Sequence, residues 1–149
     1  MRAVIQRVSS ASVTIDSSIT GKIGRGLVVL LGIHASDTDR DLRWMADKTT
    51  ALRIFEDNNG KMNLSLEDIG GEMLIISQFT LYGDCRKGRR PGYSDAAPPE
   101  IAEPIYHRFV EEIKRRQIRF ATGTFRAAMA VDLVNDGPVT LLLDSHKKF

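Results

Sequence analysis

The sequence predicts an α/β protein in which a strongly curled, mixed β-sheet of about eight strands packs against two α-helices. Three observations favour this class. Several segments alternate apolar and polar residues with the two-residue period of a strand, and others are continuous apolar runs of strand length. Two longer segments place apolar residues three and four positions apart, which is the helical period. The length of 149 residues suits one core, so residues 1–149 are expected to form a single domain.

Composition excludes several classes of protein. Hydrophobic residues make up 42% of the chain and charged residues 27%, which is typical of soluble globular proteins. No apolar run approaches a membrane span, and the N-terminus lacks a signal-peptide pattern. The single cysteine, Cys85, excludes an internal disulfide and indicates a reducing cytoplasm. Three scattered histidines and one cysteine make no metal-ligand cluster, so neither a metal nor a cofactor is expected.

The first quarter of the chain is predicted to form strands. Residues Arg2 to Val8 alternate with strand period, and Ala11 to Ile15 form a second candidate strand. A turn at Asp16-Ser17-Ser18 leads into Ile19 to Ile23, which returns as the second arm of a hairpin. Leu27 to Ile33 is predicted to be a fully apolar strand.

A helix and a small hairpin are predicted next. The helix spans about Thr38 to Leu52, with Ser36 or Asp37 as its cap and acidic residues near its start. A short strand at Arg53 to Glu56 is followed by an Asp-Asn-Asn-Gly turn, whose Asn-Gly pair tolerates positive φ. Lys61 to Leu64 then forms the returning strand.

The middle of the chain combines a buried strand, a long loop and a second helix. Glu72 to Phe79 is predicted as a strand because of its apolar run. Tyr82 to Pro99 is the longest irregular segment, and such loops in compact domains are usually functional or mobile. Pro98-Pro99 begins the second helix, which ends in Lys114-Arg115-Arg116, where cations suit the helix dipole.

Three strands are predicted in the last part. Ile118 to Ala121 forms a short one, and Phe125 to Val134 alternates over ten residues. Gly137-Pro138 interrupts the pattern, and Val139 to Leu143 is the last strand.

A polar cluster follows the buried strand: Ser77, Gln78 and Thr80, with Phe79 among them. Two interpretations stand side by side. The hydroxyls and the amide simply satisfy the backbone of a loop, as Ser and Thr often do. Alternatively, the strand end holds polar groups rigidly at the rim of a site, where they can donate to and accept from a ligand.

A second motif near the C-terminus favours the functional interpretation. Asn135-Asp-Gly-Pro-Val-Thr140, taken with Ser77-Gln-Phe-Thr80, resembles the D-aminoacyl-tRNA deacylases, the D-tyrosyl-tRNA(Tyr) deacylase family. The resemblance runs from Met1 to about Ser145. Four flanking segments share it: Gln6-Arg7-Val8, Ala11-Ser12-Val13-Thr14, Gly60-Lys61-Met62-Asn63-Leu64 and Thr122-Gly123.

This resemblance implies an activity. A family member hydrolyses the ester of D-aminoacyl-tRNA to the free D-amino acid and tRNA, which is chiral proofreading in translation, and it also removes glycine mischarged on tRNA(Ala). It needs no cofactor, and it is a homodimer with active sites at the subunit interface. Its partner is the acceptor end of aminoacyl-tRNA.

The resemblance also implies roles for individual residues. The Gly137-Pro138 bond is cis and enters the partner subunit's active site, where it rejects L-aminoacyl groups by steric exclusion. Arg7 packs near this element and fixes its orientation. Catalysis depends largely on an RNA hydroxyl and a bound water, and backbone amides around Gln78 and Phe79 are the expected oxyanion donors.

The residues themselves leave the nucleophile open. Ser77 or Thr80 would need a histidine within hydrogen-bond reach, and His34, His107 and His146 carry no local signature of such a base. Thr80 is retained as a site residue although a covalent attack by it is not favoured. A hydrolase with Thr80 as true nucleophile is therefore a rival hypothesis.

RNA contacts need local positive charge, because the net charge is only +2. The long loop supplies a basic cluster that is expected to contact phosphates, although a solvated charge run is the alternative. The cluster comprises Arg86, Lys87, Arg89 and Arg90. Two further rivals are a nucleic-acid-binding module without catalysis and a deacylase specialised for a mischarged L-amino acid.

The pocket is expected to include Phe125 and Met129, although alternation alone would make them core residues. One departure from the family pattern lies beside them. Arg126 stands where the family has Gly or Ala. If this position borders the pocket, Arg126 narrows it or adds an RNA contact.

Overall fold

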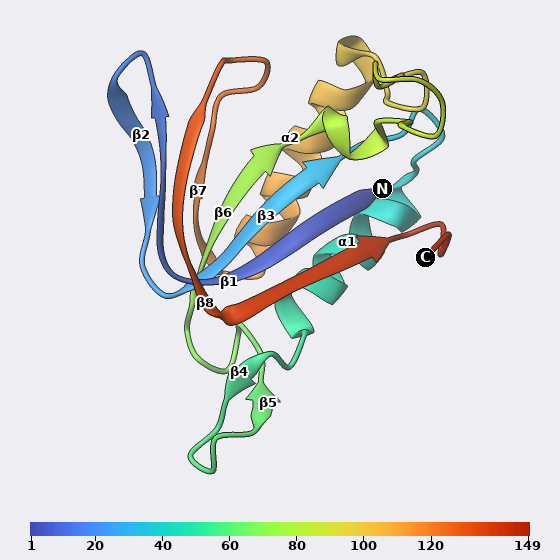
Figure 1. Ribbon diagram of the computed structural model, residues 1–149. Helices are drawn as coiled ribbons and strands as arrows, with labels where there is room; N and C mark the ends of the chain where they lie inside the picture. The colour runs from blue at the N-terminus through green and yellow to red at the C-terminus, as the bar shows by residue number, and fades with distance from the viewer.

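The computed structural model describes residues 1–149 and has a curled sheet with two helices on one face (Figure 1). Its elements, in chain order, are β1 (Arg2–Ile15), β2 (Ser18–Ile23), β3 (Gly26–Gly32), α1 (Asp39–Ala51), β4 (Phe55–Glu56), β5 (Met62–Leu64), β6 (Glu72–Ser77), the 3-10 helix η1 (Phe79–Tyr82), α2 (Pro99–Arg115), β7 (Arg119–Thr122) and β8 (Ala130–Asp144). The predicted class, with about eight strands and two helices, is confirmed. No helix is both long and apolar enough to cross a membrane.

The main sheet is mixed, as predicted. Its order is β2-β1-β3-β6-β7, with β8 paired to the other edge of β1, while β4 and β5 form a separate small sheet. β1 is antiparallel to β2, β3 and β8, whereas β6 is parallel to β3 and β7. The sheet curls until β2 meets β7: a β-carbon at Gly21 would lie 3.0 Å from the Thr122 carbonyl oxygen.

Two apolar clusters fill the two sides of the sheet. The larger cluster has 22 buried residues between the sheet and the helices, and the smaller one has seven inside the curl. β6 contributes alternately to both, because successive side chains of a strand point to opposite faces. Met73 and Ile75 belong to the larger cluster, and Leu74 and Ile76 to the smaller. This two-sided burial explains the continuous apolar run that precedes Ser77.

Two strand predictions were wrong in the same way. β1 is one strand of 14 residues rather than two, and β8 is one strand of 15 residues that continues through Gly137-Pro138. The two strands pair with each other along nearly their whole length. Pairing between β1 and β8 therefore keeps each strand continuous at residues where its own sequence pattern predicts a break.

The start of β8 also differs from the prediction. The alternating segment from Phe125 was expected to be a strand, but β8 begins only at Ala130. Residues 125–129 form a turn and an irregular stretch instead. Phe125 and Met129 are consequently placed by a loop rather than by the sheet.

The helices match their predicted ranges within one or two residues. α1 is capped by Thr38 rather than by Ser36 or Asp37. The Asp41 carboxylate accepts hydrogen bonds from the Thr38 N–H at 2.9 Å and from its hydroxyl at 2.7 Å. The carboxylate thereby satisfies an N–H at the helix start, as in a capping box. α2 begins at Pro99, where a missing N–H costs no helical hydrogen bond.

Candidate active site

The Ser77–Thr80 motif lies where β6 leaves the sheet. Ser77 is the last residue of β6, opposite Leu31 of the parallel strand β3. The chain then turns into η1, so the predicted strand ends two residues early. The Gln78 N–H donates to the Leu31 carbonyl oxygen at 2.8 Å. This amide is engaged by the sheet, so the expectation that it serves as an oxyanion donor does not fit this arrangement.

The polar side chains of the motif interact with one another. The Gln78 Nε2 donates to the Thr80 hydroxyl oxygen at 2.5 Å. Phe79 is 58% exposed, and its ring meets the edge of Tyr93 at a centroid distance of 5.1 Å. The motif thus presents an aromatic surface and a tethered hydroxyl at the rim of the sheet.

A cavity of about 580 Å³ opens beside the motif. It brings together five of the residues predicted from the sequence, namely Ser77, Gln78, Phe79, Phe125 and Met129. Most of its walls are apolar and come from β3, β6, the start of α2 and the loop before β8. A mostly apolar cavity with a few convergent polar groups is the usual form of a small-ligand site.

Of the predicted catalytic and substrate-binding residues, four do not line this cavity: Thr80, and the more distant Arg7, Gly137 and Pro138. The strand register explains the separation. Asn135 pairs with Val8, Val8 with Gly26, and Gly26 with Glu72 at the start of β6. Ser77 lies five residues further along β6, which corresponds to about 16 Å. Within one chain the two motifs therefore occupy different places.

The Gly137-Pro138 segment forms a bulge within β8 that is closed by side-chain hydrogen bonds. Its peptide bond is cis, as the family resemblance implies. The pairing register with β1 passes from Val8–Asn135 to Gln6–Thr140, so residues 136–139 bulge out opposite Arg7. The Asn135 side chain closes the bulge: its Nδ2 donates to the Thr140 hydroxyl at 3.1 Å, and its Oδ1 accepts from the Val139 N–H at 3.2 Å.

Arg7 holds this loop from beneath. It is only 5% exposed. Its Nε donates to the Asp136 carbonyl oxygen at 3.1 Å and lies 3.4 Å from the Asp136 carboxylate, while Nη1 donates to the Ile54 carbonyl oxygen at 2.6 Å. A buried guanidinium with two carbonyl partners has little freedom to move, because each lost partner would leave a buried polar group unpaired. Arg7 therefore lies directly beside the Gly-Pro element of its own chain.

None of the three histidines approaches the motif as a base. The His34 Nδ1 interacts with the Ser36 hydroxyl at 2.7 Å, and His107 faces Glu103 at 3.7 Å on the surface of α2. His146 lies 3.1 Å from the Asp37 carboxylate. Each ring therefore has a partner other than Ser77 or Thr80, and the arrangement offers no Ser/Thr–His pair.

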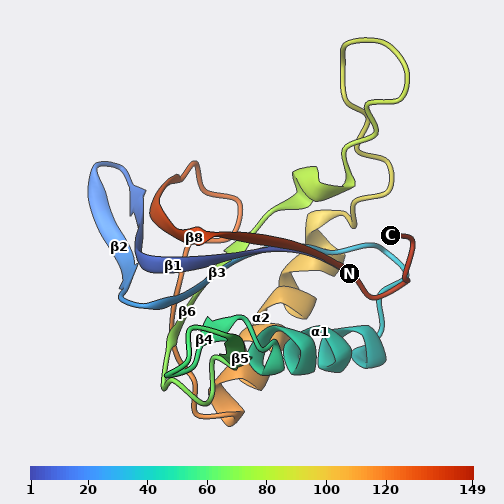
Figure 2. The ribbon, with the colours of Figure 1, turned by 60° about the horizontal axis from the view of Figure 1, so that its bottom comes forward.

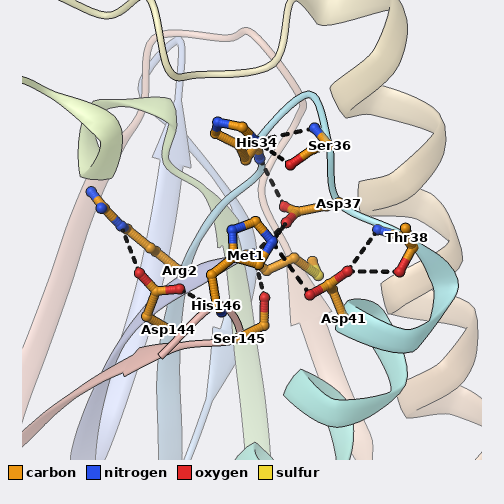
Figure 3. Close-up of polar contacts among 10 residues, drawn as sticks. All are labelled: Met1, Arg2, His34, Ser36, Asp37, Thr38, Asp41, Asp144, Ser145 and His146. Carbon is orange, nitrogen blue, oxygen red and sulfur yellow. Dashed lines mark hydrogen bonds and ion pairs between the residues drawn. The ribbon is translucent and has the colours of Figure 1, made fainter. Parts of the chain in front are cut away.

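A cluster of charged groups lies where the start of β1, the start of α1 and the end of β8 meet (Figure 3). The α-ammonium of Met1 donates to the Asp37 carboxylate at 2.5 Å and to the Ser145 hydroxyl at 2.6 Å. Asp37, Asp41 and His146 come close enough to share a metal ion. The ammonium of Met1 supplies positive charge to the two carboxylates. Local sequence patterns could not indicate this cluster, because its members lie up to 144 positions apart.

Arg2 connects this cluster to η1. Its Nη1 donates to the Leu81 carbonyl oxygen at 3.0 Å, and its Nε pairs with Asp144 at 3.2 Å. The guanidinium also lies over the Tyr82 ring, 4.6 Å from the centroid. Burial raises the pKa of the Tyr82 phenol, and the carboxylates of Asp37 and Asp144 raise it further. The last turn of the motif is thereby fixed against the β1 end of the sheet.

Asp41 is expected to make stability depend on acidic pH. Partial burial alone would raise its pKa, but hydrogen bonds from Thr38 and Ser145 and the Met1 ammonium outweigh it and lower the pKa from 3.8 to about 2. A carboxyl with a depressed folded pKa stabilises the fold above its unfolded pKa, and this stabilisation is lost as pH falls through the folded value.

The expected contribution is about 2 kcal/mol at neutral pH, lost between about pH 4 and pH 2. Chemical denaturation of the wild type and of Asp41→Asn at pH 7, 4 and 2 measures it. The unfolding free energies of the wild type and of Asp41→Asn should differ at pH 7 and become equal as the pH approaches 2. A constant difference in unfolding free energy across this range would contradict the assignment.

The basic loop projects away from the body of the molecule (Figure 2). A bridge between Asp84 and Gly92 closes its base. Arg86 is not free, because it forms a two-bonded pair with the Asp84 carboxylate at 2.9 and 2.8 Å. These bonds, with one from the Arg86 backbone N–H, hold the pKa of the Asp84 carboxyl well below its usual range. Of the predicted RNA-binding residues, Lys87, Arg89 and Arg90 remain without a carboxylate partner.

Comparison with known proteins gives a consistent result. The family described as D-Tyr-tRNA(Tyr) deacylase matches residues 4–144. A curated "D-aminoacyl-tRNA deacylase" of Desulfotalea psychrophila is 63% identical over all 149 residues of both chains. The "D-aminoacyl-tRNA deacylase" of Clostridioides difficile is 60% identical over the same length.

Two solved structures have the same fold. A protein described as "c-Myc DNA Unwinding Element Binding Protein" is 42% identical with a TM-score of 0.92, covering 97% of this chain and 98% of that one. A probable eukaryotic D-amino acid tRNA deacylase has a TM-score of 0.83, covering 95% of this chain and 97% of that one. At 18% identity, the second likeness concerns the fold alone.

Proposed function

This chain belongs to the D-Tyr-tRNA(Tyr) deacylase family and is a hydrolase of D-aminoacyl-tRNA, and we propose a site that explains how it selects and cleaves this ester. The observation that carries the proposal is the apolar cavity at the Ser77–Thr80 motif, which gathers five residues predicted for the site. The cavity takes the aminoacyl group, and the ester lies at its polar end. The whole chain acts as one deacylase domain in the cytoplasm, where aminoacyl-tRNA is used.

A second copy of the chain completes the site. Gly137 and Pro138 are exposed at the tip of a loop that does not line the cavity of its own chain. β8 also exposes large apolar side chains, with Val134 57% and Leu142 61% accessible. A two-fold dimer that covers them would let each loop enter the cavity of the other chain, since such an interface uses the same surface twice. Both features support the family's dimeric arrangement for this protein.

Selection for the D configuration follows from this composite site. The rigidly held Gly137-Pro138 loop occupies the volume that an L side chain would need, and its carbonyl groups hold the substrate's ammonium. Rejection of L-aminoacyl groups is then steric, so D side chains of many sizes are accepted. Glycine has no side chain to reject, so glycine mischarged on tRNA(Ala) is also a substrate.

Cleavage relies on positioning and on the substrate itself. A water attacks the ester carbonyl, the carbonyl oxygen becomes an oxyanion, and the ribose oxygen leaves as a hydroxyl. Because the Gln78 amide is engaged by Leu31, the Phe79 amide is the donor to which we assign the oxyanion. The vicinal ribose hydroxyl assists proton transfer, since no histidine is in place. Stabilisation of the oxyanion by fixed donors is usually the largest catalytic contribution.

The basic loop binds the phosphates of the acceptor stem. Neutralising Lys87, Arg89 and Arg90 together should weaken tRNA binding and reduce the magnitude of the slope of log K against log salt by about 2.7, since each of the three lost phosphate contacts removes about 0.9. Arg86→Ala is the matched control and should change the slope less, because Asp84 already balances its charge. Equal changes for Arg86 and for each of the other three would contradict this assignment.

The function is tested by comparing the hydrolysis of D-Tyr-tRNA and L-Tyr-tRNA. We expect rapid cleavage of the D ester only. Cleavage of both esters would remove the stereochemical filter, and preference for an L ester would favour a deacylase of mischarged L-amino acids. One solved relative is described as a binder of a DNA unwinding element. Nucleic-acid binding without cleavage of either ester would therefore favour the binding-module hypothesis.

A further inference from the structure

Arg126 is the one charged residue among the 17 that line the cavity, 12 of which are hydrophobic. Other arginines elsewhere in the chain have ion-pair partners. Arg119 pairs with Glu72 at 3.1 Å, and Arg7 lies 3.4 Å from Asp136. The guanidinium of Arg126 has neither an ion-pair partner nor a hydrogen bond within the chain. Arg126 is exposed to solvent where it lines the cavity, so its guanidinium is accessible to an anion that approaches the cavity mouth.

The backbone at Arg126 is one that an arginine rarely adopts. The Ala127 N–H donates to the Thr124 carbonyl oxygen at 3.2 Å, which closes a four-residue turn. Arg126 is the third residue of this turn and has a φ of 64°. A turn with positive φ at this place favours glycine. Bulky residues in the left-handed region gather at functional sites, where the side chain is needed in one direction.

The substrate restricts what this cation can bind. The aminoacyl end carries an ammonium, which a guanidinium repels. The anion nearest to the ester is the phosphodiester on the 5′ side of the terminal adenosine. A guanidinium matches phosphate with two parallel N–H···O bonds, which fix orientation as well as position.

We propose that Arg126 binds the phosphodiester of the terminal adenosine and thereby sets the ester at the mouth of the cavity. The inference rests on the proposed function, because it takes the cavity as the site of the aminoacyl group. It gives the cavity wall a specific RNA contact that is separate from the basic loop. Arg126 is a binding residue in this account and takes no part in the chemistry.

The test uses three D-tyrosyl esters: the full tRNA, adenosine 5′-monophosphate esterified on its ribose, and adenosine esterified in the same way without phosphate. Arg126→Gly should lower kcat/KM for the first two by about tenfold or more, since it removes hydrogen bonds to a charged group. It should leave kcat/KM for the adenosine ester unchanged. Arg126→Lys should recover part of the lost kcat/KM, because lysine keeps the positive charge but lacks the two parallel N–H donors of the guanidinium.

Arg40→Ala is the matched control, since it removes an equal charge from an exposed arginine outside the cavity. It should leave all three rates unchanged. The melting temperature of Arg126→Gly should be equal or higher, because glycine suits the turn. The proposal is overturned if Arg126→Gly slows the cleavage of all three esters equally or slows none of them.

A binding measurement separates this proposal from the proposed function. Adenosine carrying an amide-linked D-tyrosine in place of the ester cannot be hydrolysed, and it can be made with or without a 5′-phosphate. Wild-type protein should bind the phosphorylated form more tightly, and Arg126→Gly should abolish this preference. If the wild type cleaved no ester but kept the preference, the proposed function would fail while the phosphate contact stood. Equal affinities in the wild type would overturn the contact itself.

Discussion

Replacing Gly137 with alanine is expected to abolish discrimination between D- and L-aminoacyl-tRNA. Gly137 has a φ of 119°, which side chains rarely tolerate. A β-carbon there would lie 2.7 Å from the Arg7 Nη2 and 3.0 Å from a Val139 methyl group. Because Arg7 is buried and bound to two carbonyls, the loop has to move instead. A displacement of about 1 Å at a reacting site costs roughly a hundredfold in rate, so D-Tyr-tRNA cleavage should fall by that factor.

L-Tyr-tRNA should meanwhile gain or keep its rate, so the D/L ratio collapses. Gly60→Ala is the matched control. Gly60 has a similar backbone demand, with a φ of 73°, but nothing lies within 4 Å of a β-carbon there. It belongs to the hairpin between β4 and β5, far from the cavity walls. Gly60→Ala should cost some stability and leave the ratio unchanged. An unchanged ratio in Gly137→Ala would separate this loop from substrate selection.

A substrate with 2′-deoxyadenosine at its end should be cleaved at least about a hundredfold more slowly, with little change in KM. A factor of about a hundred or more is what a positioned proton-transfer group typically contributes to a reaction rate. The protein has no substitute, because its histidines have other partners. A 2′-deoxy sugar at the preceding nucleotide is the control and should leave the rate unchanged.

The substitution Thr80→Ala should lower the rate of D-Tyr-tRNA cleavage by less than about tenfold, in contrast to the large loss expected for the 2′-deoxy substrate. The Thr80 hydroxyl accepts a hydrogen bond from Gln78 at 2.5 Å and does not line the cavity. A trapped acyl-enzyme on Thr80, together with an inactive Thr80→Ala, would instead make this residue the nucleophile.

Local patterns predicted most of the fold because most elements are specified by their own residues. The apolar run before Ser77 is a strand because both of its faces are buried, and the stripe of α2 is apolar because it covers the larger cluster. The continuity of β1 could not be predicted. Ser9 and Ser10 interrupt its pattern, and only pairing with β8 carries the strand across them. Tertiary pairing commonly overrides local preference in strands.

The candidate site was likewise predictable only where a local motif specifies it. Ser77, Gln78 and Phe79 meet Phe125 and Met129 at one cavity, whereas Thr80 of the same motif does not line it. The ion cluster around Met1 was not predictable, because Met1 and Ser145 meet only through the fold. The conformation of Arg126 was equally hidden, since positive φ at an arginine has no signature in the sequence. Chemistry carried by a local motif can be predicted from sequence, whereas chemistry assembled by topology cannot.

In the proposed composite site, a cavity from one chain works with the Gly137-Pro138 loop of another. Subunit mixing tests it with two variants that should each be inactive. Gly137→Ala damages the loop, and Ala127→Trp fills the cavity. Random exchange gives hybrids as half of all dimers, and each hybrid has one cavity and one loop intact at the same site. About a quarter of the wild-type rate on D-Tyr-tRNA should therefore return, as two-fold symmetry requires.

Hybrid dimers can be counted by placing a different affinity tag on each variant, so the recovered rate can be expressed per hybrid. Recovery that rises in proportion to the hybrid fraction is the predicted result. Hybrids that form in the expected number and remain inactive on D-Tyr-tRNA would mean that each chain builds its site alone, and the composite site would be wrong.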